Sequence, residues 1–122
     1  MSKPRILVVD DDRPTCEFIA KTLSKAGYDV DTALDGAAAL SLAAERSYAL
    51  ALLDFRMPQM DGDEVYQHLT ARQPELVGIF VTGHPTLDTV FPAVNAGAAR
   101  VLAKPIDTVE LTRLVAEYVR AP

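Results

Sequence analysis

Acidic side chains follow two apolar runs of this sequence. Asp10 and Asp11 come directly after residues 6–9, and Asp54 comes directly after residues 50–53. Two full negative charges about 4 Å apart repel by roughly 4 kcal/mol at an effective dielectric near 20, so carboxylates brought together need a cation. Mg²⁺ suits such hard oxygen ligands, because it takes one or two carboxylates and completes its shell with water and phosphate oxygens. The residues therefore predict a magnesium site.

A hydroxyl and an amine follow two further apolar runs. Thr82 ends one run and is followed by Gly83, and Lys104 comes directly after another. In phosphoryl transfer the protein mainly positions the reactants and neutralises charge on the transferring oxygens. Asp54 is the candidate nucleophile, with the cation, Thr82 and Lys104 as the neutralising groups. Gly83 leaves the approach open because it has no side chain.

Five short runs of β-branched or aliphatic residues must position these groups. They cover residues 6–9, 28–33, 50–53, 78–82 and 99–103, and they alternate with segments of helical period. Three of the runs are apolar throughout, which is typical of parallel strands covered by helices on both faces. The pattern predicts an α/β fold of five strand–helix units. Ligands of such sheets bind beyond the carboxyl ends of the strands, where all the polar groups named above would lie.

The intervening segments predict five helices. Aspartates are the expected N-caps of the second, third and last helices, at Asp35, Asp61 and Asp107. Helical spacing predicts the buried residues, which are Cys16, Ile19, Ala20 and Leu23 in the first helix, Ala37, Leu40 and Ala44 in the second, Val65 and Leu69 in the third, and Leu111, Leu114, Val115 and Tyr118 in the last. Gly27 follows the first helix in the position of a C′ residue.

The fourth helix is interrupted by a proline. Leu87, Val90, Phe91 and Val94 have helical spacing, yet Pro92 lies among them. An interior proline removes one backbone hydrogen bond and clashes with the preceding turn, at a cost of about 3 kcal/mol. We expect a shortened, kinked or late-starting helix.

Length and composition limit the class of protein. The 122 residues suit one domain, and the net charge of -5 opposes direct binding to nucleic acid. The longest apolar runs cover about six residues, far fewer than the ~20 that span a bilayer, and no signal peptide is visible. The single cysteine makes no internal disulfide and is expected in the core. These features favour a cytoplasmic protein.

The sequence resembles the receiver domains of two-component response regulators along its whole length. The matching motifs are ILVVDDD at 6–12, LDFRMP at 53–58 with DG at 61–62, VTGH at 81–84 and KP at 104–105. The resemblance implies a flavodoxin-like three-layer sandwich with strand order 2-1-3-4-5. It also implies that residues 1–122 form a single receiver domain without an output domain.

The resemblance further implies a role for each matching residue. Asp54 would accept a phosphoryl group from a sensor histidine kinase or a phosphotransfer protein, in a reaction that needs Mg²⁺. The other implied roles belong to Asp11 as a direct metal ligand, Asp10 as a ligand through water, Arg56 as a ligand through its backbone carbonyl, and Thr82 and Lys104 as contacts to the phosphoryl oxygens. The chain would catalyse only its own phosphorylation and dephosphorylation. A cis bond is expected at Lys104-Pro105.

Two positions depart from the family pattern and keep an alternative open. Val101 stands where receivers usually carry Tyr or Phe, and a β-branched valine is too stiff to act as an aromatic rotor. Pro92 lies in a helix that many receivers use for output. The expected output is altered binding to an unknown downstream protein, with a homodimer on phosphorylation as one form. The alternative is a pseudo-receiver that does not switch.

Other interpretations are weaker. Asp12 is expected to cap the first helix rather than to bind the metal, and His84 is expected to be a surface residue. A magnesium-dependent phosphatase with an aspartyl nucleophile would need a second aspartate at the position of Arg56. A flavodoxin would need a Ser/Thr/Gly-rich phosphate loop after the first strand.

Overall fold

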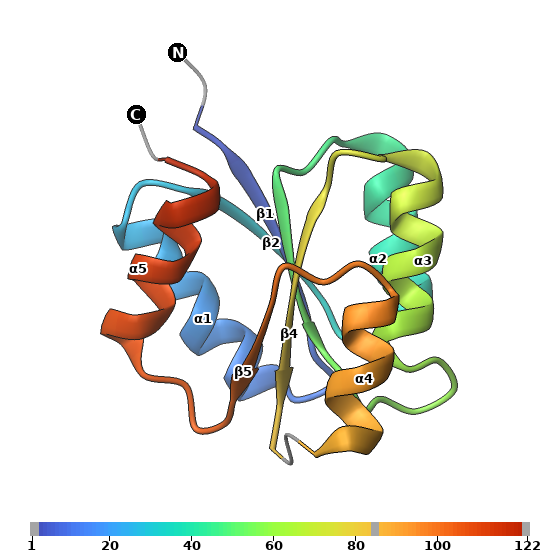
Figure 1. Cartoon of the computed structure of the whole chain (residues 1–122). Coiled ribbons are helices and arrows are strands. Elements are labelled where there is room, and N and C mark those ends of the chain that lie inside the picture. Colours follow the sequence, from blue (N-terminus) through green and yellow to red (C-terminus); the bar gives the residue numbers. More distant parts are fainter. Residues whose placement is uncertain (1–2, 84–85, 121–122) are drawn as a thin grey trace.

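Five strands alternate with five helices in the computed structural model, which describes residues 3–83 and 86–120. The strands are β1 (Arg5–Val9), β2 (Asp29–Ala33), β3 (Leu50–Asp54), β4 (Val77–Thr82) and β5 (Arg100–Ala103). All strand pairs are parallel, and the sheet order is β2-β1-β3-β4-β5 (Figure 1). The fold class and strand order are confirmed. Each strand differs from its expected range by one residue at one end.

The helices cover both faces of the sheet. They are α1 (Arg13–Lys25), α2 (Gly36–Glu45), α3 (Gly62–Arg72), α4 (Leu87–Asn95) and α5 (Thr108–Tyr118). Figure 1 shows α1 and α5 on one face and α2, α3 and α4 on the other. This arrangement is the expected three-layer sandwich. No helix in the described part of the chain is long and apolar enough to span a membrane.

The central strands β1, β3 and β4 supply the middle of the core. Alternate residues of each strand point to opposite faces, so that Leu7 and Val9 join the cluster under α2 and α3 while Ile6 and Val8 join the cluster under α1 and α5. All four side chains are at most 1% exposed. This two-sided burial explains why these strands are apolar throughout.

The N-caps and the Gly27 prediction are largely confirmed. The side chains of Asp12, Asp35 and Asp107 accept hydrogen bonds from backbone amides in the first turns of α1, α2 and α5. Gly27 follows α1 with a φ of 104°, which suits glycine. Asp61 stands at the N-cap position of α3, but its side chain makes no capping hydrogen bond there. The predicted capping role of Asp61 is therefore wrong.

The predicted buried face of α2 is also wrong. Ala37 and Ala44 are exposed and Leu40 is half-buried, whereas Gly36, Ala39 and Ala43 are buried. The helix is alanine-rich, so apolar spacing alone did not fix its orientation. A Cβ on Gly36 would lie 2.8 Å from Cγ2 of Val65 in α3. The absence of a side chain at Gly36 therefore lets α2 approach α3 closely, with the Gly36 side of α2 facing the core.

The other predicted helix faces agree with the structure, with two exceptions, of which one is Ala20 of α1, which is half-buried. Cys16, Ile19 and Leu23 of α1 are buried, and Leu111, Leu114 and Val115 of α5 are buried, but Tyr118 is 38% exposed. The Tyr118 hydroxyl instead accepts a hydrogen bond from Nε of Arg100.

The helix that contains Pro92 is the shortest described, with 9 residues. The carbonyl of Pro92 still accepts a hydrogen bond from the amide of Ala96 at 2.9 Å, so the helix continues past the proline for one more turn. A shortened helix was one of the expected outcomes. The prediction for His84 lies outside the described residues.

Candidate functional site

The carboxyl ends of four strands bring the predicted site residues to one edge of the sheet. Asp54 ends β3 and Thr82 ends β4, while Asp10 follows β1 and Lys104 follows β5. Asp10, Asp54 and Thr82 are buried although they are polar. Because adjacent parallel strands end side by side, residues far apart in the sequence become neighbours here.

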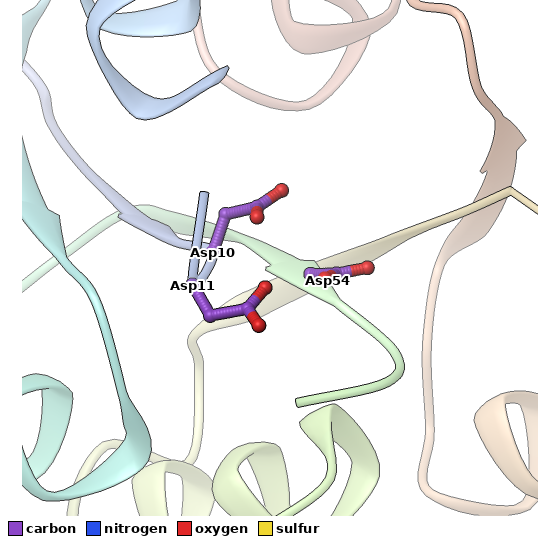
Figure 2. Close-up of side chains that lie close together, drawn as sticks. All are labelled: Asp10, Asp11 and Asp54. Atoms are coloured by element: carbon purple, nitrogen blue, oxygen red, sulfur yellow. The ribbon is translucent and has the colours of Figure 1, made fainter. Parts of the chain in front are cut away.

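Three carboxylates gather at this edge. One oxygen atom each of Asp10, Asp11 and Asp54 lies within 4.8 Å of the other two (Figure 2). Asp11 is exposed, whereas Asp10 and Asp54 are 3% and 8% exposed. The group is therefore open to solvent on the Asp11 side and enclosed by protein on the other. Its all-oxygen donors fit a hard divalent cation such as Mg²⁺.

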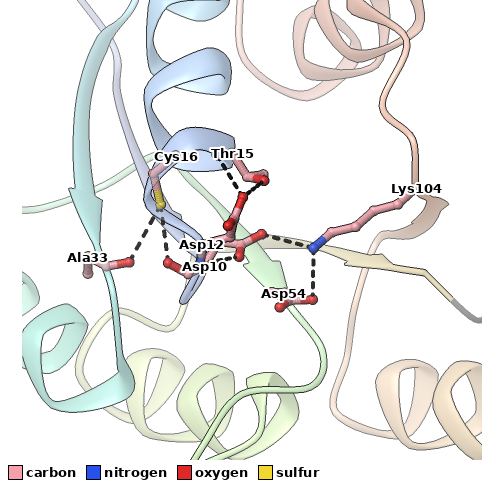
Figure 3. A network of polar contacts seen from close by, with 7 residues as sticks. All are labelled: Asp10, Asp12, Thr15, Cys16, Ala33, Asp54 and Lys104. Carbon is pink, nitrogen blue, oxygen red and sulfur yellow. Dashed lines mark hydrogen bonds and ion pairs between the residues drawn. The ribbon is translucent and has the colours of Figure 1, made fainter.

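Lys104 connects two of these carboxylates. Its Nζ donates a hydrogen bond to Oδ2 of Asp10 at 3.1 Å and lies 3.4 Å from Oδ1 of Asp54 (Figure 3). The Lys104 amide also donates to the Thr82 carbonyl at 2.8 Å, which fixes the strand end that carries the lysine. The bond between Lys104 and Pro105 is cis, as predicted.

The electrostatics of the site follow from this enclosure. Burial raises the pKa of Asp54 to about 6, the negative charge of Asp10 adds to the rise, and Lys104 opposes it. Burial alone would lower the pKa of Lys104, but its contacts with Asp10 and Asp54 outweigh burial, so that pKa lies above its ordinary value. Lys104 therefore remains a fixed positive charge beside a carboxylate whose ionisation is unfavourable without further positive charge.

Asp10 is held in place by several groups. Its Oδ1 accepts a hydrogen bond from the amide of Asp12 at 2.9 Å, and its backbone carbonyl accepts one from Sγ of Cys16 at 3.3 Å (Figure 3). Its own amide donates to the carbonyl of Ala33 in β2. Asp10 thus presents its second oxygen, Oδ2, to Lys104 with little freedom to move.

The segment between β3 and α3 packs against the backbone of Asp54. The amide of Gly62 donates a hydrogen bond to the carbonyl of Phe55 at 2.8 Å. A Cβ on Gly62 would lie 2.4 Å from the backbone oxygen of Asp54, closer than real Cβ atoms approach. The first residue of α3 therefore packs directly against the backbone of Asp54. Gly62 was not among the predicted site residues, and its only signal in the sequence is the DG pair at 61–62.

The structure also places Asp12, Arg56 and Val101, which the sequence singled out. Asp12 accepts a hydrogen bond from the amide of Thr15 and acts as an N-cap, as expected. The Arg56 side chain is 62% exposed and lies over the ring of Phe55, with Cζ 5.4 Å from the ring centroid. Val101 is half-buried, pairs with Phe80 across β4 and β5, and packs against the core cluster.

Comparison with known proteins agrees with this geometry. The family model described as "Response regulator receiver domain" matches residues 6–116. Over 120 residues the chain is 33% identical to the response regulator protein PilR of Pseudomonas aeruginosa, and the match covers 98% of this chain and 27% of PilR. The chain spans 25% to 60% of the length of the curated relatives it matches.

Solved structures show the same fold. A CheY-like receiver domain protein from Methanospirillum hungatei matches with a TM-score of 0.91 and 31% identity, over 95% of this chain and 93% of that one. A response regulator from Burkholderia pseudomallei, described as having a phosphorylated aspartic acid and a calcium ion, matches with a TM-score of 0.84 and 28% identity, over 93% of this chain and 65% of that one.

Proposed function

This chain belongs to the response regulator receiver domain family, and we propose that it accepts a phosphoryl group on Asp54 in an Mg²⁺-dependent reaction. The observation that carries the proposal is the position of Lys104, whose Nζ lies 3.1 Å from Asp10 and 3.4 Å from Asp54 beside the three-carboxylate group. A fixed cation and a set of oxygen ligands around one buried carboxylate are what a developing phosphoryl charge requires.

The metal ligands that we propose are Asp11 and Asp54 directly, Asp10 through water, and the backbone carbonyl of Arg56. The cation supplies charge neutralisation for the carboxylates and for the phosphoryl oxygens. Asp11 is the exposed member of the carboxylate group, so a hydrated ion reaches it first. Asp10 is already engaged by Lys104 and by the Asp12 amide, which agrees with an indirect role.

In the transfer step an oxygen of the ionised Asp54 attacks the phosphorus of a phosphohistidine on a sensor histidine kinase or phosphotransfer protein. The new O–P bond forms as the P–N bond breaks, and the histidine nitrogen keeps the electron pair of that bond. The Lys104 ammonium and the Thr82 hydroxyl contact the phosphoryl oxygens as the charge moves. The chain itself catalyses only this step and the later hydrolysis of the acyl phosphate, in the cytoplasm.

The signal passes to a downstream protein through a change in binding affinity. The phosphoryl group carries about two negative charges and replaces the single charge of the ionised Asp54, so the site gains about one negative charge beside Lys104. This change favours a different arrangement of the groups that contact it. Val101 does not provide an aromatic rotor, so the change has to travel through other contacts, such as the hydrogen bond between the Lys104 amide and the Thr82 carbonyl.

Phosphorylation is tested with Mg²⁺ and acetyl phosphate as the small phosphodonor. Intact-protein mass spectrometry should show the addition of one phosphoryl group, and Asp54→Asn should abolish it. Asp35→Asn, which changes an exposed N-cap aspartate on α2, is the matched control and should be labelled normally. Labelling of Asp54→Asn to the same extent as the unsubstituted chain would contradict the assignment.

A second experiment separates a switching receiver from a pseudo-receiver. Amide chemical shifts are compared with and without beryllium fluoride, which mimics the phosphoryl group. A receiver that switches should show shift changes in β5 and α5 as well as in the residues that contact the mimic. Changes confined to the residues around Asp54 would favour the pseudo-receiver.

A further inference from the structure

Asp61 makes two contacts within the segment that connects β3 to α3. Its Oδ1 accepts a hydrogen bond from the backbone amide of Met57 at 3.3 Å, and its Oδ2 lies 3.7 Å from Nη1 of Arg56. The residue occupies the N-cap position of α3 without a capping hydrogen bond from its side chain. Its carboxylate therefore faces back toward the loop, away from the role that its position in the helix would suggest.

The contact with Met57 is also a contact with the peptide group of Arg56. The amide nitrogen of Met57 and the carbonyl of Arg56 belong to one planar unit. Within the described residues the only cis bond is between Lys104 and Pro105, so this peptide is trans, and its N–H and C=O point in opposite directions. A carboxylate that holds the N–H on one side thereby aims the carbonyl to the other side and increases the negative charge on its oxygen.

We propose that Asp61 is a positioning residue for the metal site, which acts by holding the Met57 amide and so orienting the carbonyl of Arg56 as a ligand. This inference rests on the proposed function, because it takes the Arg56 carbonyl to be a metal ligand. Residues that orient a ligand from behind commonly change metal affinity when they are substituted, although they never touch the ion.

The other contact of Asp61 does not explain its placement. The Arg56 and Asp61 side chains are 62% and 39% exposed, and ion pairs at that exposure contribute little. Met57, in contrast, is 8% exposed and packs in the core cluster, so the peptide that Asp61 holds is anchored by a buried side chain. Pro58 follows directly and restricts the backbone of Met57 further. The hydrogen bond thus acts on a segment with few other conformations.

The test is a titration of the full chain with MgCl₂, followed by amide chemical shifts, for the unsubstituted protein and three variants. Asp61→Ala removes the acceptor and the charge. Asp61→Asn removes the charge but keeps an oxygen acceptor for the Met57 amide. Asp35→Ala removes an aspartate at the N-cap position of α2 that lies outside the proposed site, and it controls for the loss of a negative charge at the start of a helix.

We expect Asp61→Ala to weaken Mg²⁺ binding about tenfold, and Asp61→Asn and Asp35→Ala to remain within about twofold of the unsubstituted chain. The Met57 amide proton should move upfield in Asp61→Ala, where its hydrogen bond is lost, and should keep its position in Asp61→Asn.

Two results would overturn the role of Asp61 while leaving the metal site intact. One is normal Mg²⁺ affinity in Asp61→Ala. The other is equal weakening in Asp61→Ala and Asp61→Asn with the Met57 amide still hydrogen-bonded in the latter, which would show that charge alone matters. Absence of binding by the unsubstituted chain would refute the proposed metal site and this inference together.

Discussion

Replacing Asp54, the proposed phosphoacceptor, should stabilise the metal-free protein. The pKa of Asp54 is raised from 3.8 to about 6, so the folded state holds the proton more tightly than the unfolded chain does. The ionised Asp54 side chain therefore opposes folding: its unfavourable contribution to stability is absent below about pH 4, grows as the pH rises from about 4 to 6, and is complete above pH 7. Asp54→Asn carries no charge and avoids this loss.

The size of the effect follows from the shift. Roughly two pKa units at 1.36 kcal/mol each give about 3 kcal/mol at pH 8 as an upper limit. Water that enters the site reduces this figure, and we expect Asp54→Asn to raise the free energy of unfolding by about 1–2 kcal/mol at pH 8. At pH 5 about half of the gain should remain, because Asp54 is then largely protonated in the folded state.

The assay is urea unfolding followed by circular dichroism in EDTA, at pH 8 and pH 5. Asp29→Asn, an exposed aspartate on the edge strand β2, is the control for the loss of one negative charge and should change stability by less than about 0.5 kcal/mol. Adding Mg²⁺ should stabilise the unsubstituted chain more than Asp54→Asn. The reasoning would be refuted if Asp54→Asn were less stable than the unsubstituted chain at pH 8, or if its gain were equal at the two pH values.

Three further predictions concern the surroundings of the site. Gly62→Ala should lower the free energy of unfolding, measured in urea, by about 2–3 kcal/mol, because the added Cβ would lie 2.4 Å from the Asp54 carbonyl oxygen. The control is Gly83→Ala, because nothing lies within 4 Å of a Cβ at that position. An equal effect of both substitutions would contradict the packing argument. Gln73→Ala removes three side-chain hydrogen bonds to the backbone of the last turn of α2 and of the loop that follows it. It should lower the free energy of unfolding by about 2 kcal/mol and leave acetyl phosphate labelling unchanged; altered labelling would show that this end of the sheet influences the site. Burial raises the pKa of Cys16 to about 11, so iodoacetamide at pH 8 should alkylate the unfolded chain but not the folded one, and rapid alkylation of the folded protein would refute this burial.

The strands were predictable because burial on both faces leaves a simple pattern. β1 and β3 read as unbroken apolar runs, and each was placed within one residue of its observed range. The site followed from the same reasoning, because residues directly after parallel strands meet at one edge. Strand order was not derivable from these patterns, since any right-handed arrangement of five units would satisfy them, and it came from the resemblance to receiver domains.

The parts that could not be predicted depend on particular contacts between backbones and side chains. The buried face of α2 is set by the approach of Gly36 to α3, and an alanine-rich helix carries no spacing signal for it. The roles of Asp61 and Gly62 depend on the path of the loop after Asp54, where Gln59 takes a positive φ of 72°. The DG pair indicated a turn and a helix start, but not which atoms the two residues would meet.

The contact between Gly62 and the Asp54 backbone has a consequence for transplanting this chemistry to another parallel sheet. The turn after Asp54 is closed by a hydrogen bond between its two ends, which the amide of Gly62 donates to the carbonyl of Phe55. A graft that carried only the acidic residues would leave Asp54 without the close contact between its backbone and Gly62. The segment to transfer would therefore comprise the end of β3 with Asp54, the hydrogen-bonded turn that follows it, and Gly62 at the start of α3.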